Sequence, residues 1–359
     1  MQKKADGQNY APVGKAAPVC GPGEFPIGVI GLEHGHIYGM CNGLCEAGAT
    51  IELVWDEDAA KVAVFREVYP AAQAAGSKDE VLSSERIKLV AAAGIPNQRG
   101  PLGIEVLRSG KDYFADKPPL TTMEQLAQAK QAVEETGQKF GVYYSERLHV
   151  EAAVYAGRLI ETGAIGKVVQ VMGWGPHRLN APTRPDWFYD KEQYGGILVD
   201  IGCHQIEQIL AFAGAEDATI NYARTGNYAH KEHPGLDDYG DASLTCDNGV
   251  AGYFRVDWFT PEGLGAWGDG RTIIVGTEGY IEIRKYIDIA SSPEGDHVYL
   301  VNQDGEQHFS AAGTCGFPFF GAFIRDCLDR TELAMSQAHT FQAIELAIRA
   351  RDCADIIDT

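Results

Sequence analysis

From residue 25 to residue 115, short apolar runs alternate with stretches whose apolar residues recur at helical spacing. Strands that take turns with helices predict a parallel sheet with helices on both faces. The runs predict strands over residues 26–30, 51–55, 87–92 and 112–115, and the stretches predict helices over residues 37–45, 59–68 and 102–109.

A helix-start signal stands at residues 121–124. Thr121-Thr122-Met123-Glu124 is a capping box, in which the threonine hydroxyl and the glutamate satisfy free amides of a helix that runs to about Thr136. Gly137 ends this helix, and a strand is expected over residues 139–144. A domain boundary near residues 145–150 fits this pattern.

The remaining chain carries turn signals that are typical of antiparallel neighbours. Helices are expected over residues 150–162 and 196–213, with a strand over 167–172 and a polar, proline-rich loop around 176–185 between them. Two helices are expected to close the chain, over residues 319–328 and 337–357. The hairpin signals are Asp247-Asn248-Gly249, Thr277-Glu278-Gly279 and Asp304-Gly305.

These patterns divide the chain into three parts. Residues 1–24 are rich in Gly, Pro and Ala, so we expect an extended arm there. Residues 25–147 are expected to form a Rossmann domain with a doubly wound parallel sheet, and residues 148–359 a second α/β domain.

Composition narrows the class of ligand. The chain has 359 residues, of which 45% are hydrophobic and 22% charged, as in ordinary globular proteins. Its formal net charge of -20 repels nucleic acid and acidic membrane surfaces. We therefore expect a small, neutral substrate, and neither a nucleic-acid partner nor a membrane.

The cysteines and the N-terminus indicate a cytoplasmic protein. The eight cysteines are scattered and form no C-x-x-C pair, which suits free thiols in a reducing compartment. Although Met1-Gln2-Lys3-Lys4 resembles the start of a signal peptide, no apolar segment follows it, so we expect no export.

The segment that follows residue 25 has the layout of a dinucleotide site. A strand, a glycine turn beginning at Gly31 and a helix are followed by Asp56 at the end of the next strand. In such sites, loop amides and the helix N-terminus hold the pyrophosphate, and the acid accepts hydrogen bonds from ribose hydroxyls. Because Glu57 and Asp58 would repel a ribose phosphate, the sequence favours NAD over NADP.

The glycine turn departs from the G-x-G-x-x-G pattern. Glu33 and His36 stand at its second and third glycine positions, so only Gly31 is retained. If a dinucleotide binds here, Glu33 must point away from the pyrophosphate or the loop must take another path. A Rossmann-like domain that binds no dinucleotide stays open as an alternative.

Three further residues suit proton transfer. Lys117 follows a strand at the carboxyl edge of the parallel sheet, and the two prolines after it stiffen the turn and permit a cis bond. Asp200 and His204 are four residues apart in the helix expected after Gly195-Gly196, so they share one face. A carboxylate there can orient an imidazole that acts as general base.

These motifs resemble those of the Gfo/Idh/MocA oxidoreductases. Asp116-Lys117-Pro118 resembles the family's Glu-Lys-Pro signature, and residues 195–204 resemble its Gly-Gly-(Gly)-x-Leu-x-Asp-x-Gly-x-His signature. The segments Ala93-Gly94-Ile95-Pro96-Asn97, Ala164-Ile165-Gly166-Lys167 and Ile274-Val275-Gly276-Thr277-Glu278-Gly279 match further motifs in the family's order. Departures are Asp116 in place of glutamate, Arg99 where histidine is frequent, and the altered glycine turn.

The resemblance implies a fold and a set of roles. The second domain would carry a large, mostly antiparallel open sheet that builds a homodimer or homotetramer. Lys117 would hold the reacting hydroxyl of a sugar, glycoside or polyol, His204 would accept its proton and Asp200 would orient the imidazole, while hydride passes to NAD or, less favourably, NADP. The residues implied at the cofactor are Gly31, Leu32, Glu33, His34, His36, Asp56, Pro96, Asn97, Asp116 and Lys117.

Candidate substrate contacts lie on loops and strand ends of this fold. Aromatic faces and an arginine suit a sugar or cyclic polyol, and the residues of this kind are Tyr144, Arg147, His177, Trp187 and Tyr189. The pairs His34 with His36 and His230 with His233 lack a carboxylate or thiol at recognisable spacing, so no metal site is expected.

Two other functions remain open. Some relatives oxidise a sugar transiently, eliminate its aglycone and restore NAD, and so act as glycosidases. The altered glycine turn also suits a non-catalytic sensor of sugar or dinucleotide.

Overall fold

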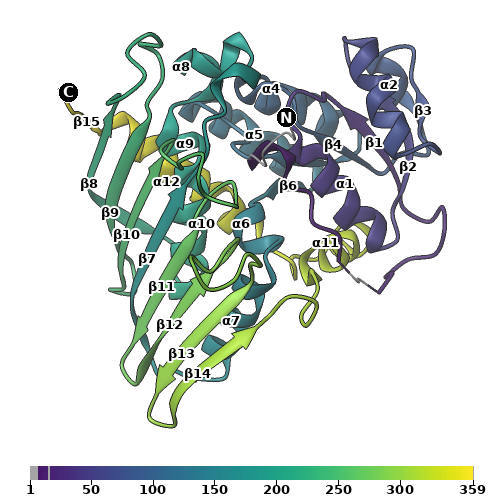
Figure 1. Ribbon diagram of the computed structural model, residues 1–359. Helices are drawn as coiled ribbons and strands as arrows, with labels where there is room; N and C mark the ends of the chain where they lie inside the picture. The colour runs from purple at the N-terminus through teal and green to yellow at the C-terminus, as the bar shows by residue number, and fades with distance from the viewer. Residues whose placement is uncertain (1–6, 15–16, 359) are drawn as a thin grey trace. The chain divides into compact units, whose positions relative to one another are not determined.

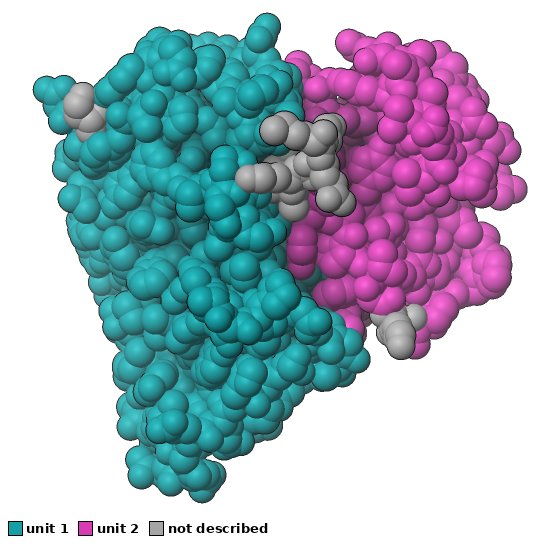
Figure 2. Space-filling view, viewed as in Figure 1, with its two compact units in different colours: residues 1–7, 144–315, 342–359 teal, residues 8–143, 316–341 magenta. Residues whose placement is uncertain are grey.

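The computed structural model describes residues 7–14 and 17–358, which form two compact units. We call residues 8–143 with 316–341 the parallel-sheet unit, and Gly7, 144–315 and 342–358 the mixed-sheet unit. Figure 2 colours the two units separately. The chain enters the mixed-sheet unit at Tyr144, returns to the parallel-sheet unit at Gly316 and leaves it again inside the last helix.

The parallel-sheet unit contains a six-stranded sheet in the order β3-β2-β1-β4-β5-β6 (Figure 1). All five neighbouring pairs are parallel. The chain winds outward from β1 in one direction and then from β4 in the other, which places the switch point of a Rossmann fold between β1 and β4. The strands are β1 (Pro26–Ile30), β2 (Thr50–Trp55), β3 (Gln73–Ala74), β4 (Leu89–Ala92), β5 (Asp112–Asp116) and β6 (Phe140–Tyr143).

Six helices accompany this sheet. The expected doubly wound sheet is confirmed, and the predicted helix over residues 59–68 has the observed bounds. Five helices lie within the first stretch of the unit, and the sixth, α11, comes from the later segment and packs on α1. They are α1 (His36–Glu46), α2 (Ala59–Val68), α3 (Lys78–Ser83), α4 (Pro96–Arg108), α5 (Met123–Thr136) and α11 (Pro318–Asp329).

Helix α4 begins at Pro96, six residues before the predicted start at residue 102. Pro101 inside the helix has no amide hydrogen to donate to the carbonyl four residues earlier, at Asn97. The side-chain amide of Gln125 donates to that carbonyl instead, at 2.8 Å. A side chain from α5 therefore allows the helix to include a proline that the sequence indicated as its boundary.

The cap of α5 also differs from the prediction. Thr122, not Thr121, is the N-cap residue, and its hydroxyl accepts from the Gln125 amide at 3.1 Å. The expected end is confirmed, because Gly137 has the left-handed conformation that ends many helices (φ 68°).

The described part of the predicted extended arm begins with a 3₁₀ helix, Gly7–Asn9, and from Gln8 onward it packs along α1. A Cβ atom on Gly35 would lie 2.2 Å from the Gln8 carbonyl oxygen, so the arm's backbone passes close to the start of α1. Farther along, the amide of Gly14 donates to Glu46 at 2.9 Å, and that of Val19 donates to the Ala47 carbonyl at 2.9 Å. Residues 1–6 and 15–16 of the predicted arm lie outside the described residues.

The mixed-sheet unit contains a nine-stranded sheet in the order β14-β13-β12-β11-β7-β10-β9-β8-β15 (Figure 1). Only the β7–β10 and β8–β15 pairs are parallel, so the expected large, mostly antiparallel sheet and its three hairpin turns are confirmed. The strands are β7 (Val168–Pro176), β8 (Ala218–Gly226), β9 (Tyr239–Cys246), β10 (Ala251–Asp257), β11 (Arg271–Gly276), β12 (Gly279–Arg284), β13 (His297–Asn302), β14 (Gly305–Ser310) and β15 (Asp355–Ile356).

Helices cover one face of this sheet. Helix α10 packs on β7 and β10, α9 on β9, and α7 on β12 and β13. Trp174, Tyr222 and Tyr280 are exposed among the strand residues. The helices of this unit are α6 (Ser145–Leu148), α7 (Glu151–Glu161), α8 (Lys191–Tyr194), α9 (Ile197–Asp200), α10 (Gly202–Ala213) and most of α12 (Gln337–Asp352).

Two predicted helices of this region need correction. The helix expected over residues 196–213 is two helices, α9 and α10, which are separated at Ile201 (φ -100°, ψ -38°). The last helix ends at Asp352 rather than near residue 357, since Asp355 and Ile356 pair with β8 as β15. In the part of the chain that the structure describes, no helix combines the length and apolar composition needed to cross a membrane.

Asp296 gives the mixed-sheet unit a testable pH dependence. Its carboxylate accepts from the Ala152 amide at the start of α7, at 2.8 Å. Burial raises the pKa of Asp296 to about 6, against the opposing effect of the Ala152 hydrogen bond and with a further increase from Glu151. The folded state therefore binds this proton more tightly than the unfolded chain, and stability falls as pH rises from about 4 to 6.

Asp296→Asn should stabilise the protein at pH 7.5. Asparagine keeps the acceptor for Ala152 and tolerates the left-handed backbone at this position (φ 59°). We expect a gain of about 1–2 kcal/mol at pH 7.5, allowing for partial exposure, and none below pH 4. Urea denaturation at both pH values measures this difference, with Asp304→Asn on an exposed turn as the control. An equal change in the free energy of unfolding at both pH values would contradict this prediction.

Candidate functional site

The glycine turn after β1 is fixed by bonds to its neighbouring strands. Gly31 has φ 82°, and a Cβ atom there would lie 3.1 Å from the backbone of Gly94. The Leu32 amide donates to Asp56 Oδ2 at 2.6 Å, and the His34 amide donates to the Ala93 carbonyl at 2.9 Å. The turn thus connects the carboxyl ends of β1, β2 and β4.

A hollow of about 460 Å³ opens at these strand ends. Asp56 and Glu57, which directly follow β2, line this hollow. Glu33, from the glycine turn after β1, lines it too. Doubly wound folds bind their ligands at this edge of the sheet. The other lining residues are Ile30, Trp55, Lys78, Gly94, Ile95, Gln98, Arg99, Pro101, Leu102 and Glu105.

Glu33 contributes less negative charge to this hollow than the sequence suggested. Its carboxylate forms an ion pair with Lys61 of α2. The pair is about one-third exposed, so its effect on stability is small, but it balances the charge at the position where the family pattern has glycine.

Pro96 and Asn97 stand at the start of α4, next to the same strand ends. Pro96 occupies the first turn, where a proline's missing amide hydrogen costs nothing. The side-chain oxygen of Asn97 is buried, and no described residue donates a hydrogen bond to it. A buried acceptor of this kind is suited to a donor on a ligand.

Asp116, at the end of β5, is the centre of a buried charged cluster. His36 Nδ1 lies 2.8 Å from Oδ1, while His34 Nδ1 and Arg99 Nη2 lie 3.3 Å and 3.0 Å from Oδ2. Burial alone would raise the pKa of Asp116, but Arg99 and then the two histidines hold it well below its usual range. Asp116 is therefore ionised at neutral pH. We call these four residues the Asp116 cluster.

Arg99 joins the Asp116 cluster to the backbone around Lys117. Its guanidinium donates to the carbonyls of Lys117 and Pro118, and its Nε donates to the Gly94 carbonyl at 2.7 Å. The Lys117–Pro118 peptide bond is cis, as the sequence permitted. Arg99 thus fixes the turn that carries Lys117.

The Asp116 cluster contains ligand types that metals use, which the sequence analysis did not detect. One atom from each of His34, His36 and Asp116 lies within 4.8 Å of the others. Arg99 already binds the same carboxylate, so a cation would have to displace a buried guanidinium. Burial, and then His36, hold the pKa of His34 well below its usual value. We assign no metal here.

The predicted catalytic residues are distributed over both units. Lys117 belongs to the parallel-sheet unit and is 5% exposed, whereas Asp200 and His204 belong to the mixed-sheet unit and are 8% and 2% exposed. The joint action of the three residues stays a prediction.

Asp200 and His204 do not share one continuous helix. Asp200 ends α9, and His204 lies in the first turn of α10. The preceding turn requires glycine, because Gly195 and Gly196 have φ values of 94° and 85°. A Cβ atom on Gly202 would lie 3.1 Å from the Phe254 ring, so the start of α10 is closely packed on β10.

Two of the predicted substrate residues lie beside α10. Tyr144 is fully buried, with its ring centroid 6.4 Å from that of His204. Arg147 donates to the fully buried Glu207 in a forked ion pair, at 2.7 Å from Nε to Oε1. Arg147 therefore already has a carboxylate partner in its own unit, and its contact with substrate stays a prediction.

The other three predicted substrate residues, His177, Trp187 and Tyr189, belong to a cluster of aromatic rings. His177 is buried and lies 4.5 Å from Trp267, centroid to centroid. Tyr189 stacks on His233 at 3.6 Å and donates to the Ala181 carbonyl. Trp187 is partly exposed, yet its indole nitrogen is buried and donates to no described residue. Their roles in binding also stay predictions.

Sequence reasoning missed a fully buried ion pair between Glu146 and Lys285 in the mixed-sheet unit, 2.7 Å from Nζ to Oε2. Glu146 stands next to Arg147, and Lys285 directly follows β12. A lysine at the end of a half-buried strand is ordinarily solvent-exposed, so the sequence carried no local signal for this pair.

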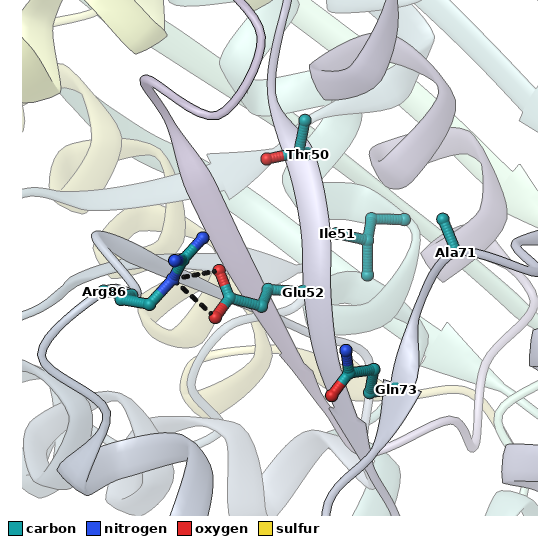
Figure 3. Close-up of a pocket in the computed structure, with 6 residues that line it drawn as sticks. All are labelled: Thr50, Ile51, Glu52, Ala71, Gln73 and Arg86. Carbon is teal, nitrogen blue, oxygen red and sulfur yellow. Dashed lines mark hydrogen bonds and ion pairs between the residues drawn. The ribbon is translucent and has the colours of Figure 1, made fainter.

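A second hollow, of about 330 Å³, lies at the amino end of β2 (Figure 3). Thr50, Ile51, Glu52, Ala71, Gln73 and Arg86 line it, and Arg86 forms an ion pair with Glu52. It lies at the end of β2 opposite to Asp56, and doubly wound folds do not bind their ligands at this edge. We assign it no function.

A parallel sheet of Rossmann topology, with a glycine turn and an acid beside a hollow at its carboxyl edge, defines a nucleotide-binding α/β protein. Residues 25–144 match the oxidoreductase family with an NAD-binding Rossmann fold, and residues 154–282 match the GFO/IDH/MocA C-terminal domain. The chain belongs to the Gfo/Idh/MocA oxidoreductase family.

Named relatives match parts of the chain. It is 29% identical over 209 residues to scyllo-inositol 2-dehydrogenase (NAD(+)) of Bacillus subtilis, which is 57% of each chain. It is 25% identical over 150 residues to D-xylose dehydrogenase of Paenarthrobacter nicotinovorans, covering 40% of this chain and 38% of that protein. The chain thus spans about half the length of these relatives.

A solved structure is similar over almost the whole chain. The crystal structure of a "putative oxidoreductase" from Erwinia carotovora atroseptica SCRI1043 is 51% identical, with a TM-score of 0.91. The match covers 93% of this chain and all of that one.

Removing Arg99 should destabilise the parallel-sheet unit in a pH-dependent way. Arg99→Met leaves the buried Asp116 without its main counter-charge, so we expect a loss of about 3–5 kcal/mol at pH 8. In the wild type, the lowered pKa of Asp116 stabilises the fold above pH 4. In Arg99→Met, burial raises the pKa of Asp116, so the loss of stability relative to the wild type should become smaller as the pH falls toward 5.

Urea denaturation at pH 8 and pH 5.5 measures this loss. Arg108→Met is the matched control, because Arg108 is exposed on the same helix and lies 3.3 Å from Glu135. We expect the control to change stability by less than about 0.5 kcal/mol. Similar losses in both variants would show that Asp116 does not depend on Arg99.

Proposed function

We propose that the protein is an NAD-dependent dehydrogenase that transfers hydride between the cofactor and a secondary hydroxyl or ketone of a sugar, glycoside or polyol. The observation that carries this proposal is the hollow at the carboxyl ends of β1, β2 and β4, with Asp56 beside the glycine turn. Family membership supplies the reaction class, and the names of the two relatives supply the substrate class.

The hollow and its surroundings fit a dinucleotide. Asp56 and Glu57 would accept hydrogen bonds from the hydroxyls of the adenosine ribose. The turn from Gly31 through Leu32 to Glu33 would lie beside the pyrophosphate. Asn97 offers a buried acceptor farther along the edge of the sheet. The remaining residues of this cofactor site would be His34, His36, Pro96, Asp116 and Lys117.

The charges around the hollow support NAD rather than NADP. Asp56, Glu57 and Glu105 line it, and Lys78 is paired with Glu105 at 2.6 Å. A 2′-phosphate would meet these carboxylates, while the two basic residues of the lining, Lys78 and Arg99, are already paired with Glu105 and Asp116, so its binding costs free energy.

The bound nicotinamide would accept hydride from the carbon that carries the reacting hydroxyl. Lys117, on a turn fixed by Arg99, would hold that hydroxyl by donating a hydrogen bond to its oxygen. His204 would take the hydroxyl proton as general base, and Asp200 would orient the imidazole and stabilise its cation. In the reverse direction, His204 would return the proton to the ketone oxygen.

The partners and location follow as further parts of the proposal. The exposed strand residues Trp174, Tyr222 and Tyr280 support assembly into a homodimer or homotetramer through the nine-stranded sheet. The eight cysteines form no disulfide among the described residues, which supports a cytoplasmic location. The net charge of -20 supports a neutral small-molecule substrate and no nucleic-acid or membrane partner.

The cofactor preference can be measured by titration of NADH and NADPH fluorescence. We expect NADH to bind at least tenfold more tightly than NADPH, a difference of about 1.4 kcal/mol. Asp56→Asn should narrow this ratio, because it removes charge beside the ribose but keeps an acceptor. Glu67→Gln, on the exposed side of α2, is the control. Equal affinities in the wild type would contradict the preference, and no binding of either cofactor would favour a sensor.

The catalytic roles can be tested by following NADH absorbance with scyllo-inositol, D-xylose and related polyols. Lys117→Met and His204→Asn should each lower kcat by at least about 100-fold. Lys130→Met, exposed on α5, should leave kcat unchanged. Activity within a few-fold of wild type in either variant would reject its role. Cleavage of a chromogenic glycoside without accumulation of NADH would identify a glycosidase instead.

A further inference from the structure

Glu146 is a buried carboxylate in which one oxygen accepts hydrogen bonds and the other accepts none from the described residues. Its Oε2 accepts from Lys285 Nζ at 2.7 Å and from Gln205 Nε2 at 2.8 Å. Burial alone would raise the pKa of Glu146, but Lys285, and then His204 and His177, lower it well below its usual range. Glu146 is therefore ionised throughout the physiological pH range, and Lys285 balances its charge.

Glu146, Gln205 and Trp258 each have one buried polar atom without a hydrogen-bond partner among the described residues. The three atoms are Glu146 Oε1, Gln205 Oε1 and Trp258 Nε1. The Gln205 assignment is fixed by its neighbour, since only the amide nitrogen can donate to Glu146. The set therefore offers two acceptors and one donor. Each buried polar group without a partner costs about 1–3 kcal/mol, so three together call for an explanation.

His177 lies next to Glu146 and Trp258. Its Nε2 is 4.0 Å from Glu146 Oε1, and its ring centroid is 5.4 Å from that of Trp258. Its Nδ1 lies 3.0 Å from the Gly175 carbonyl, which can only accept, so Nδ1 carries a hydrogen. His177 is thus held in one orientation, with Nε2 toward the carboxylate.

Two glycines of β7 leave room for Gln205. Cβ atoms on Gly173 and Gly175 would lie 2.3 Å and 2.8 Å from the Gln205 side-chain amide. Any other residue at these two positions would displace the amide that binds Glu146. The strand, α10 and α6 therefore hold the Gln205 and Glu146 side chains together in one place.

We propose that Glu146, Gln205 and Trp258 bind hydroxyl groups of a neutral polyol, other than the hydroxyl that reacts. This inference rests on the proposed function, because it identifies the substrate of that enzyme as a molecule with several hydroxyls. A hydroxyl both donates and accepts, so a polyol can satisfy two acceptors and one donor at once. The bond to the ionised Glu146 is charge-assisted and is the strongest of the three. Lys285 neutralises the site, which therefore does not favour a charged sugar.

Trp258→Phe and Glu146→Gln test this proposal by isothermal titration of scyllo-inositol and D-xylose into the NADH-loaded protein. Trp258→Phe keeps an aromatic side chain but removes a buried donor that has no hydrogen-bond partner among the described residues. The smaller ring loses part of the indole's packing, so we expect a small decrease in the melting temperature of the polyol-free protein, and Kd should rise by about threefold to tenfold. Glu146→Gln replaces the acceptor by an amide and should raise Kd at least tenfold. The double variant Glu146→Gln/Lys285→Met avoids an unpaired buried lysine if the single variant unfolds.

Tyr228→Phe, which removes an exposed hydroxyl after β8, is the control and should leave Kd unchanged. Unchanged Kd values in both test variants, or no binding of either polyol by the wild type, would overturn the proposal. So would a lower melting temperature in polyol-free Trp258→Phe together with unchanged binding, because the indole would then be structural. Polyol binding that depends on Glu146 but gives no NADH from NAD would instead overturn the dehydrogenase proposal and leave this site intact.

Discussion

The buried ion pair between Arg99 and Asp116 is the constraint on which the candidate cofactor site depends. Asp116 is fully buried, and an ionised carboxylate in that position is tolerable only because a guanidinium lies 3.0 Å away. The same guanidinium binds the carbonyls after β4 and β5. One side chain therefore satisfies a buried charge and also fixes the backbone that presents Lys117.

The departures from the family pattern compensate for one another in space. Asp116, shorter than the usual glutamate, is met by Arg99 at the position where histidine is frequent, and by His36 where a glycine is missing. Glu33, at the other missing glycine, is balanced by Lys61. Each substitution seemed unfavourable alone, but the Asp116 cluster and the Glu33–Lys61 pair restore charge balance around the turn.

The sequence predicted those parts of the fold that local patterns determine. Alternating apolar runs located the parallel sheet, and the turn residues located the hairpins. Two helix boundaries were predicted wrongly. At Pro101, the helix continues because a side chain from α5 donates to the carbonyl that the proline cannot reach. At Ile201, the predicted single helix is interrupted next to Gly202, which packs closely on Phe254. Glu146 and Lys285 are 139 residues apart in the chain, and no local pattern predicts such a pair.

The two buried carboxylates also differ in a way that suits two kinds of ligand. Arg99 balances the charge of Asp116, and Lys117 lies close enough to lower the pKa of His34, so Lys117 leaves one positive charge beside the Asp116 cluster in a chain of net charge -20. An anionic pyrophosphate needs such a surplus, because the rest of the protein repels it. The charge of Glu146 is balanced chiefly by Lys285, and a neutral polyol needs no surplus of positive charge. The distribution of buried charge thus distinguishes the proposed site for an anionic cofactor from the proposed site for an uncharged substrate.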